Sequence, residues 1–155
     1  MNKNNLKWLF IALGGVFLGR YFYMKNAIDL MARTMWGEAR SEGNIGMQAV
    51  GNVIMNRANN GKVWDGVSIV GVITKDNQFS AWNIGDPNRE KMLTVNDNDP
   101  VFRNALRIAE QLVNGELGDI TDGADHYHTI FISPYWADEM EFIKDINNHR
   151  FYRSA

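Results

Sequence analysis

The sequence predicts an α+β fold, mainly helical, in which an N-terminal hydrophobic helix precedes one domain with a small β element. Three observations predict it. Apolar residues recur at helical spacing over residues 28–38, 47–58 and 101–112. Residues 126–132 and 146–152 are rich in β-branched and aromatic side chains, and an uncharged apolar run precedes all of these at 8–19. A length of 155 residues suits one domain with its own core.

Residues 1–25 are predicted to be a signal-anchor or transmembrane segment, and residues 26–155 a separate domain. The uncharged run rises about 18 Å as a helix, less than the ~30 Å hydrocarbon core, so even residues 6–24 form only a marginal span. Lys3 and Lys7 predict a cytoplasmic start, which places the domain on the periplasmic, extracytoplasmic side of the inner membrane. A cleaved signal peptide is disfavoured because no small-x-small site follows. A buried N-terminal helix is the other alternative.

Two helices are predicted at the start of the domain. Asn26 is expected to cap the first, whose apolar stripe ends at Glu38. The second is expected over residues 47–58, with the turn residues 59–61 ending it. The stretch between the two helices, residues 39–46, is expected to be a loop.

The later elements follow from turn chemistry and composition. A short helix is expected around residues 67–73, followed by a long loop at 77–98 that is rich in Asn, Asp, Gly and Pro. The Asp-Pro pair that opens residues 99–112 predicts the clearest helix of the chain. Residues 126–132 are expected to form a strand, with 146–152 as its partner.

Composition and charge exclude several classes of protein. The 18 acidic and 16 basic side chains give a formal net charge of −2, so no basic field exists to bind nucleic acid. The chain has no cysteine, which removes disulfides, Cys-ligated metals and thiol catalysis. A phosphate loop, a dinucleotide fingerprint and a Gly-x-Ser-x-Gly elbow are also absent from the sequence, so nucleotide enzymes and serine esterases lose support.

Glu38 is the first candidate for catalysis. A carboxylate that continues an apolar helical face is expected to be partly desolvated, and it then keeps a proton that it can donate at neutral pH. The alternative is a solvated glutamate at a helix end. Glu42 lies one turn further but beyond the expected helix, so the spacing predicts no carboxylate pair.

His126 and His128 would point to the same side of a strand, as two metal ligands can. Asp125 or His149 could complete a zinc site. Two histidines without a third ligand at a diagnostic spacing are a weak signal, so we expect no metal and no cofactor. The alternative is a pair of hydrogen-bonded histidines beside a groove.

Several aromatic residues lie next to Gly, Pro, Asn or Ser in expected loops or at element ends. Aromatic faces stack on sugar rings and amides, so these residues indicate a saccharide groove, while ordinary core packing is the alternative. They are Trp36, Phe79, Trp82, Tyr127, Tyr135 and Trp136.

Five segments in order resemble the motifs of a known family. They are ARTMWGEARSEGNIGMQAVGNVIMNR (32–57), QFSAW (78–82), GADHYHT (123–129), SPYWA (133–137) and NHRFY (148–152). The chain therefore resembles the SleB/CwlJ-type cell-wall hydrolases, the spore cortex-lytic enzyme family.

The resemblance implies a lysozyme-like, mainly helical domain that acts on the glycan strands of peptidoglycan. It makes Glu38 the catalytic acid. It also implies a substrate groove, in which we expect a set of binding residues: Gln78, Phe79, Ser80, Trp82, His126 and Tyr127. The family's third motif often continues with Tyr-Asn-Pro, whereas this chain has His-Thr-Ile at 128–130, so substrate contacts after Tyr127 are expected to differ.

The expected activity is cleavage of the glycan strand, of the lytic transglycosylase or muramidase type. The absence of a second motif carboxylate favours the lytic transglycosylase, which needs only one. We expect a monomer whose partners are peptidoglycan and the cytoplasmic membrane, with a role in host lysis as a phage endolysin. Two alternatives remain open. One is a metal-dependent peptidoglycan amidase that uses His126 and His128, and the other is a catalytically inactive wall-binding protein.

Overall fold

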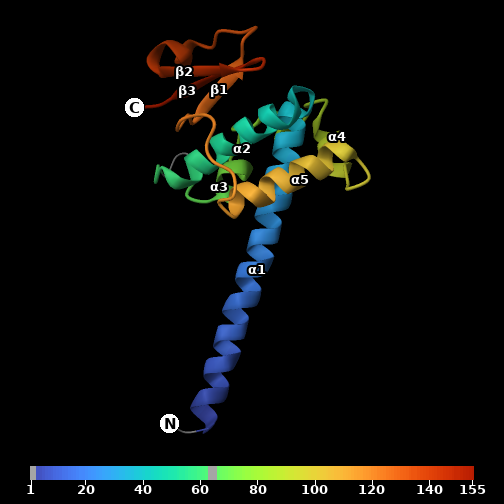
Figure 1. Ribbon diagram of the computed structural model, residues 1–155, viewed down its shortest axis with the longest axis vertical. Helices are drawn as coiled ribbons and strands as arrows, with labels where there is room; N and C mark the ends of the chain where they lie inside the picture. The colour runs from blue at the N-terminus through green and yellow to red at the C-terminus, as the bar shows by residue number, and fades with distance from the viewer. Residues whose placement is uncertain (1–2, 63–65) are drawn as a thin grey trace.

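The computed structural model describes residues 3–62 and 66–155, with side chains from Leu18 onward in these ranges. The chain begins with one long helix, α1 (Lys3–Ala39), whose first half extends away from the rest of the molecule (Figure 1). The other elements gather around and beyond its second half. In chain order they are η1 (Arg40–Glu42), α2 (Gly43–Asn59), α3 (Ile69–Thr74), η3 (Ser80–Trp82), α4 (Arg89–Thr94), α5 (Pro100–Val113), β1 (His126–Thr129), η4 (Tyr135–Glu139), β2 (Glu141–Ile146) and β3 (His149–Arg153).

Helix α1 passes through Asn26 without a break, so the prediction that a helix begins at Asn26 is wrong. No glycine or proline interrupts residues 20–36, and an asparagine inside a helix costs less than about 0.7 kcal/mol. The side chains of residues 1–17, most of the predicted signal-anchor, lie outside the described residues. Within the part of the chain that is described, no helix is long and apolar enough to cross a membrane.

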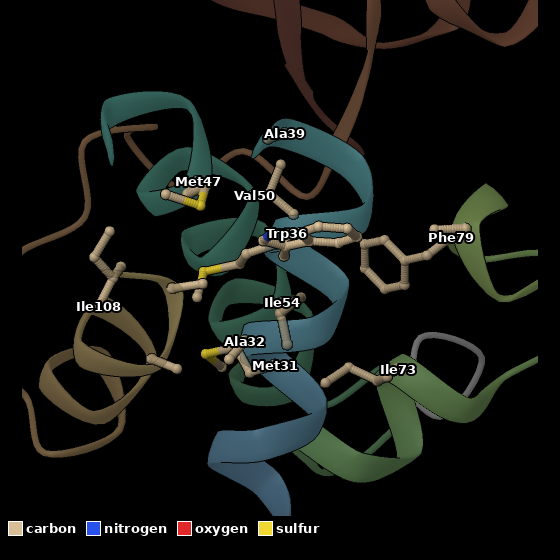
Figure 2. Packing of buried hydrophobic residues seen from close by; sticks show 14 of the residues in the cluster. Met31, Ala32, Trp36, Ala39, Met47, Val50, Ile54, Ile73, Phe79 and Ile108 are labelled. Atoms are coloured by element: carbon tan, nitrogen blue, oxygen red, sulfur yellow. The ribbon is translucent and has the colours of Figure 1, made fainter. Parts of the chain in front are cut away.

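The second half of α1 forms the centre of the hydrophobic core (Figure 2). Met35 is fully buried and belongs to one cluster with Ile54 of α2 and Ile108 of α5. Helix α2 comes very close to α1 and α5 at Gly51. A Cβ added there would lie 2.4 Å from Leu112 Cδ1 of α5 and 2.8 Å from Met35 Sδ of α1. The three packed helices therefore fix the last turns of α1 within the domain.

A three-stranded antiparallel sheet of order β1-β3-β2 lies beyond the end of α1 (Figure 1). The central strand β3 packs on α2 through a second buried cluster that contains Phe151 and Val53. The sequence predicted a single partner strand at 146–152. Strand β3 occupies most of that range and pairs with β1, and the additional strand β2 precedes it. Strand β2 was missed because it is an edge strand with three charged residues, which obscure its apolar pattern.

The polar connections contain more helix than the sequence predicted. Residues 39–46 were expected to be a loop, but α2 already begins at Gly43, after the single turn η1. The expected loop at 77–98 includes η3 and α4. The unpredicted helices η1, η3 and α4 have only one or two turns each, too short to show a full apolar period.

Two helices follow the prediction closely. Ser68 caps α3 by accepting a hydrogen bond from the Gly71 N–H at 3.1 Å. Asp99 caps α5, and the helix buries the apolar face that was expected of it. The predicted fold class, mainly helical α+β with a small β element, is confirmed.

Candidate active site

Glu38 lies in the last turn of α1, and three hydrogen bonds hold its carboxylate. Oε1 accepts from the Ser80 hydroxyl at 3.1 Å and from the Ala81 N–H at 2.8 Å. Oε2 accepts from the Tyr127 hydroxyl at 3.2 Å. The residue is half-buried, in agreement with its predicted place at the end of a buried helical face. Three segments that are distant in sequence thus meet at one carboxylate.

Gly37 allows η3 to reach this carboxylate. A Cβ added at Gly37 would lie 2.7 Å from Ala81 Cβ and 3.0 Å from Met92 Sδ, closer than atoms of these types pack. Only a residue without a side chain lets η3 approach α1 so closely at this point. The hydrogen bond from Ala81 to Glu38 depends on that approach.

Tyr127 comes from β1, where it is paired with Phe151 of β3. Its ring lies 5.6 Å from the ring of Phe151 and 5.2 Å from that of His149, measured between centroids. Burial and the nearby charge of Glu38 raise the pKa of Tyr127 well above its ordinary value. The hydroxyl therefore stays protonated and acts as a donor to Glu38 at neutral pH.

Arg57, near the end of α2, is a buried cation that was not among the residues predicted from the sequence. Its Nε donates to the backbone oxygen of Asp125 at 2.5 Å, and its Nη1 donates to Gln78 Oε1 at 2.9 Å. The guanidinium also lies over the Phe79 ring. Arg57 continues the apolar face of α2, so the same helical spacing that indicates Glu38 also indicates a buried position for Arg57.

A polar groove of about 440 Å³ opens beside Glu38, between η3 and the strand β1. Among the described residues that line it, Glu38 is the single carboxylate. Arginine, amide, hydroxyl and aromatic side chains supply the rest of the wall. The lining consists of Gly37, Glu38, Arg57, Asn77, Gln78, Ser80, Asn83, Asn88, Tyr127, His128, Thr129, Ile132, Pro134, Trp136 and His149.

The structure brings Gln78, Ser80 and Tyr127 into this groove, where substrate-binding residues were predicted. It places Phe79 elsewhere, because that side chain is 2% exposed and packs in the core beneath Arg57. Trp82 is also outside the lining, since its indole N–H points to the buried Thr34 and donates to its hydroxyl at 2.9 Å.

Two aromatic residues proposed for a saccharide groove have other positions. Trp36 lies inside α1 and is 7% exposed, so it belongs to the core (Figure 2). Tyr135 is 85% exposed and is not part of the lining. Trp136, in contrast, does line the groove.

The three histidines occupy two faces of the sheet. His126 and His128 share one face, where both rings contact Trp136. His149 faces the opposite side and contacts Tyr127. His126 is outside the groove lining, contrary to its predicted place there, because its ring pairs with Asp125 at 2.8 Å at the start of β1; His128, on the same face, does line the groove.

These positions do not fit a zinc site. His149 cannot join His126 and His128 across the sheet, and one Asp125 oxygen is already paired with His126. Nowhere in the described ranges do three histidine or carboxylate side chains gather as metal ligands would.

The sequence matches the family model described as Cell Wall Hydrolase over residues 41–152. The chain belongs to this cell wall hydrolase family. The match covers the groove residues from Arg57 to His149 and begins three residues after Glu38. Within the family, the resemblance to SleB/CwlJ-type hydrolases is supported by three further comparisons.

Two solved structures share the fold of this cell wall hydrolase. The catalytic domain of the SleB protein of Bacillus cereus has a TM-score of 0.66 and 27% identity, covering 83% of this chain and 91% of that chain. The catalytic domain of the germination-specific lytic transglycosylase SleB from Bacillus anthracis has a TM-score of 0.65 and 27% identity. That match covers 83% of this chain and 94% of the other.

A spore cortex-lytic enzyme of Halalkalibacterium halodurans is 46% identical over 59 residues. This segment is 38% of the present chain and 17% of that relative. The cell wall hydrolase described here therefore spans a small part of the length of its curated relative.

Proposed function

We propose that this member of the cell wall hydrolase family cleaves the glycan strands of peptidoglycan as a lytic transglycosylase, with Glu38 as both acid and base. The observation that carries the proposal is that Glu38 is the single carboxylate among the described residues of the groove lining. A glycosidase that uses water normally places a second carboxylate across the scissile bond, whereas an intramolecular attack needs only one. A solved relative that covers 83% of this chain is itself described as a lytic transglycosylase.

The two oxygens of Glu38 have different surroundings. Oε1 accepts two hydrogen bonds, from Ser80 and Ala81, which occupy both of its lone pairs. Oε2 accepts one, from Tyr127, and keeps a lone pair for a proton. We therefore assign the transferable proton to Oε2.

In the proposed reaction this proton passes to the glycosidic oxygen that follows N-acetylmuramic acid, and the bond from C1 to that oxygen breaks. The acetamido group of the same sugar stabilises the positive charge that develops at C1. The Glu38 carboxylate then removes the proton of the muramoyl 6-hydroxyl as its oxygen bonds to C1. Glu38 ends in its starting protonation state, no water is consumed, and the product is a 1,6-anhydro sugar.

Glu38→Gln tests the catalytic assignment. Glutamine keeps the size of the side chain and can still accept hydrogen bonds, but it has no transferable proton. We expect turbidity clearing of permeabilised cells to fall by about 10² to 10⁴ while the thermal unfolding transition survives. A folded Glu38→Gln variant with normal clearing would refute the role of Glu38.

Mass spectrometry of digested peptidoglycan tests the reaction type. After borohydride reduction, anhydromuropeptides should lie about 20 mass units below the products of a muramidase, because they lack one water and take up no hydrogen. Reducible muramic ends would instead show that water is the nucleophile. Chelators should leave clearing unchanged, and chelator-sensitive release of peptides would support the amidase alternative.

We also propose that residues 1–25 hold the enzyme at the cytoplasmic membrane as a monomer, with the domain on the outer side, for use in phage-driven host lysis. The described part of this segment supports a membrane surface contact, because Tyr21 and Phe22 are more than 60% exposed next to Arg20. The marginal length of the apolar run favours an anchor that can be released.

Fractionation of cells tests this anchor. We expect the uncleaved protein in the membrane fraction, and its release when the membrane is de-energised. Replacing Gly14 and Gly15 by leucine should strengthen the anchoring and delay lysis, because leucine favours the bilayer centre by a few tenths of a kcal/mol per residue. A mature N-terminus mapped near residue 25 would show a cleaved signal peptide instead.

A further inference from the structure

His149 is a groove residue without a role in the reaction proposed above. It is the first residue of β3 and pairs with Thr129 of the edge strand β1. The residue is 6% exposed, yet it lines the groove. Its ring meets that of Tyr127 edge-on, at an angle of 88° and a centroid distance of 5.2 Å. His149 therefore contacts Tyr127, the residue that donates a hydrogen bond to Glu38.

The imidazole of His149 has unused hydrogen-bonding capacity. Among the described residues, the buried side-chain nitrogen and oxygen atoms without a hydrogen-bond partner are His149 Nδ1 and Trp36 Nε1. A buried N–H without an acceptor is less tolerable than a buried lone pair without a donor, so the ring proton belongs on Nε2. Nε2 is not one of the buried unpaired atoms, so of the two ring nitrogens it is the one open to a ligand in the groove that His149 lines.

The backbone that carries His149 is held firmly in place. Glu42 accepts hydrogen bonds from the N–H and the side-chain amide of Asn148, at 3.1 and 3.0 Å. Asn147 also donates to the backbone oxygen of Glu42 at 2.8 Å. These contacts attach the β2–β3 turn to η1, directly after the helix that carries Glu38. The position of the ring relative to Glu38 is thus fixed by the fold.

Four titratable groups act on His149: Tyr127 of β1 contacts its ring, and Glu38 of α1, Glu42 of η1 and His128, on the other face of β1, act through their charges. Burial lowers the pKa of His149, the two carboxylates act in the opposite direction, and His128 adds to the lowering. The net lowering keeps the ring neutral at neutral pH. A neutral ring carries one donor and one acceptor, which matches the tautomer inferred from its surroundings.

We propose that His149 is a substrate-binding residue whose Nε2–H donates a hydrogen bond to an acceptor oxygen, hydroxyl or acetamido carbonyl, of the N-acetylated sugar that lies in the groove beside Glu38. This inference rests on the proposed function, because it takes the glycan strand as the ligand. In this role His149 adds a polar contact to that of Glu38, on the wall of the groove opposite η3. This contact orients the sugar toward Oε2 of Glu38.

The binding test uses the inactive Glu38→Gln enzyme, so that peptidoglycan fragments bind without being cleaved. In this background His149→Phe keeps a ring against Tyr127 but removes the donor, whereas His149→Gln places an amide N–H near the position of Nε2. We expect His149→Phe to weaken the binding of glycan fragments by about 2- to 10-fold, and His149→Gln to restore most of it. Equal affinities for the Phe and Gln variants would overturn the proposal.

Nitrogen-15 spectra of the histidine ring give a readout that a purely structural role would not move. We expect the Nε2–H tautomer of His149 in the free Glu38→Gln enzyme, and a shift of its Nε2 signal when glycan fragments bind. If the enzyme is saturated with glycan fragments and the Nε2 signal of His149 does not shift, the contact is refuted while the proposed function stands. A shift together with reducible products from the active enzyme would instead keep the contact and reject the transglycosylase reaction.

Discussion

At the residue scale, the approach of η3 to Glu38 at Gly37 is the most sensitive contact of the site. Gly37→Ala forces a Cβ into the space of Ala81 Cβ, 2.7 Å away, and so displaces η3 and the N–H that binds Glu38. A displacement of about 1 Å at a catalytic group can reduce the rate about 100-fold. We expect a loss of this order in the clearing of permeabilised cells.

Gly19→Ala is the matched control for this variant. Gly19 lies in the same helix, and nothing lies within 4 Å of the Cβ that the substitution adds. Its clearing activity should equal that of the unmodified enzyme. Equal activities for Gly37→Ala and Gly19→Ala would show that η3 adapts without moving Glu38's hydrogen-bond donor.

The sequence could predict only part of the site. Helical spacing made Glu38 a candidate, and the family resemblance made it the expected catalytic acid; the same spacing also places Arg57 on a buried face. His149 could not be assigned, since its place in the groove depends on the register between β3 and β1. Phe79 and Trp82 were expected to bind substrate, but an aromatic residue in a loop packs inward or outward according to the tertiary contacts it meets.

At the element scale, α5 shows how a cap contributes to stability. Asp99 Oδ1 accepts hydrogen bonds from the N–H groups of Val101 and Phe102, at 2.8 and 2.9 Å. Asp99→Ala leaves these donors without the side-chain acceptor, which typically costs about 1 kcal/mol. For a protein of this size the melting temperature should fall by roughly 2–4 °C, as calorimetry can measure.

Asp97→Ala is the control, because Asp97 is exposed and accepts from Arg103 through its backbone oxygen, which alanine keeps. Its melting temperature should stay within about 1 °C of the unmodified value. A smaller effect of Asp99→Ala than of Asp97→Ala would mean that water replaces the cap without loss.

The elements that the sequence predicted well are those whose local signals agree. Helix α5 has a capping aspartate, a proline at its start and a complete apolar face, so each signal indicates the same boundaries. Strand β2 and helix α4 lack such agreement, because each is short and rich in charge. Asn26 gave a false helix start, since a good capping residue is also tolerated inside a helix that already continues past it.

At the scale of the whole molecule, stability is expected to depend on pH through His149. In the unfolded chain a histidine has a pKa near 6.5, whereas burial lowers the pKa of His149 in the folded protein. The unfolded state then binds more protons, so the stability due to the neutral ring is complete above about pH 6.5 and is lost as the pH falls through the folded-state pKa. The loss is at most about 1.4 kcal/mol per pH unit for one proton.

Urea unfolding of the unmodified protein and of His149→Gln, between pH 7.5 and 5, measures this contribution. The difference between the two free energies of unfolding should shrink as the pH falls. The titration of Asp125 does not affect this pH range. Burial alone would raise the pKa of Asp125, but hydrogen bonds from His126 and Ser154 outweigh burial and lower it. The stability that the Asp125 carboxylate contributes is therefore lost only below about pH 4. A pH-independent difference would show that His149 does not resist protonation.

The unbroken course of α1 also fixes the distance between residue 25 and the active site. Glu38 is thirteen residues beyond Lys25 in one continuous helix, which corresponds to about 20 Å along the helix axis. If residues 1–25 are held in the membrane as proposed, this distance acts as a spacer that sets which layer of the wall the groove can touch. It also sets the direction in which the groove opens, because each residue added to a helix turns everything beyond it by about 100°. A tethered enzyme would therefore sample a thin shell of glycan in one orientation, and release from the membrane would give it access to the rest of the wall.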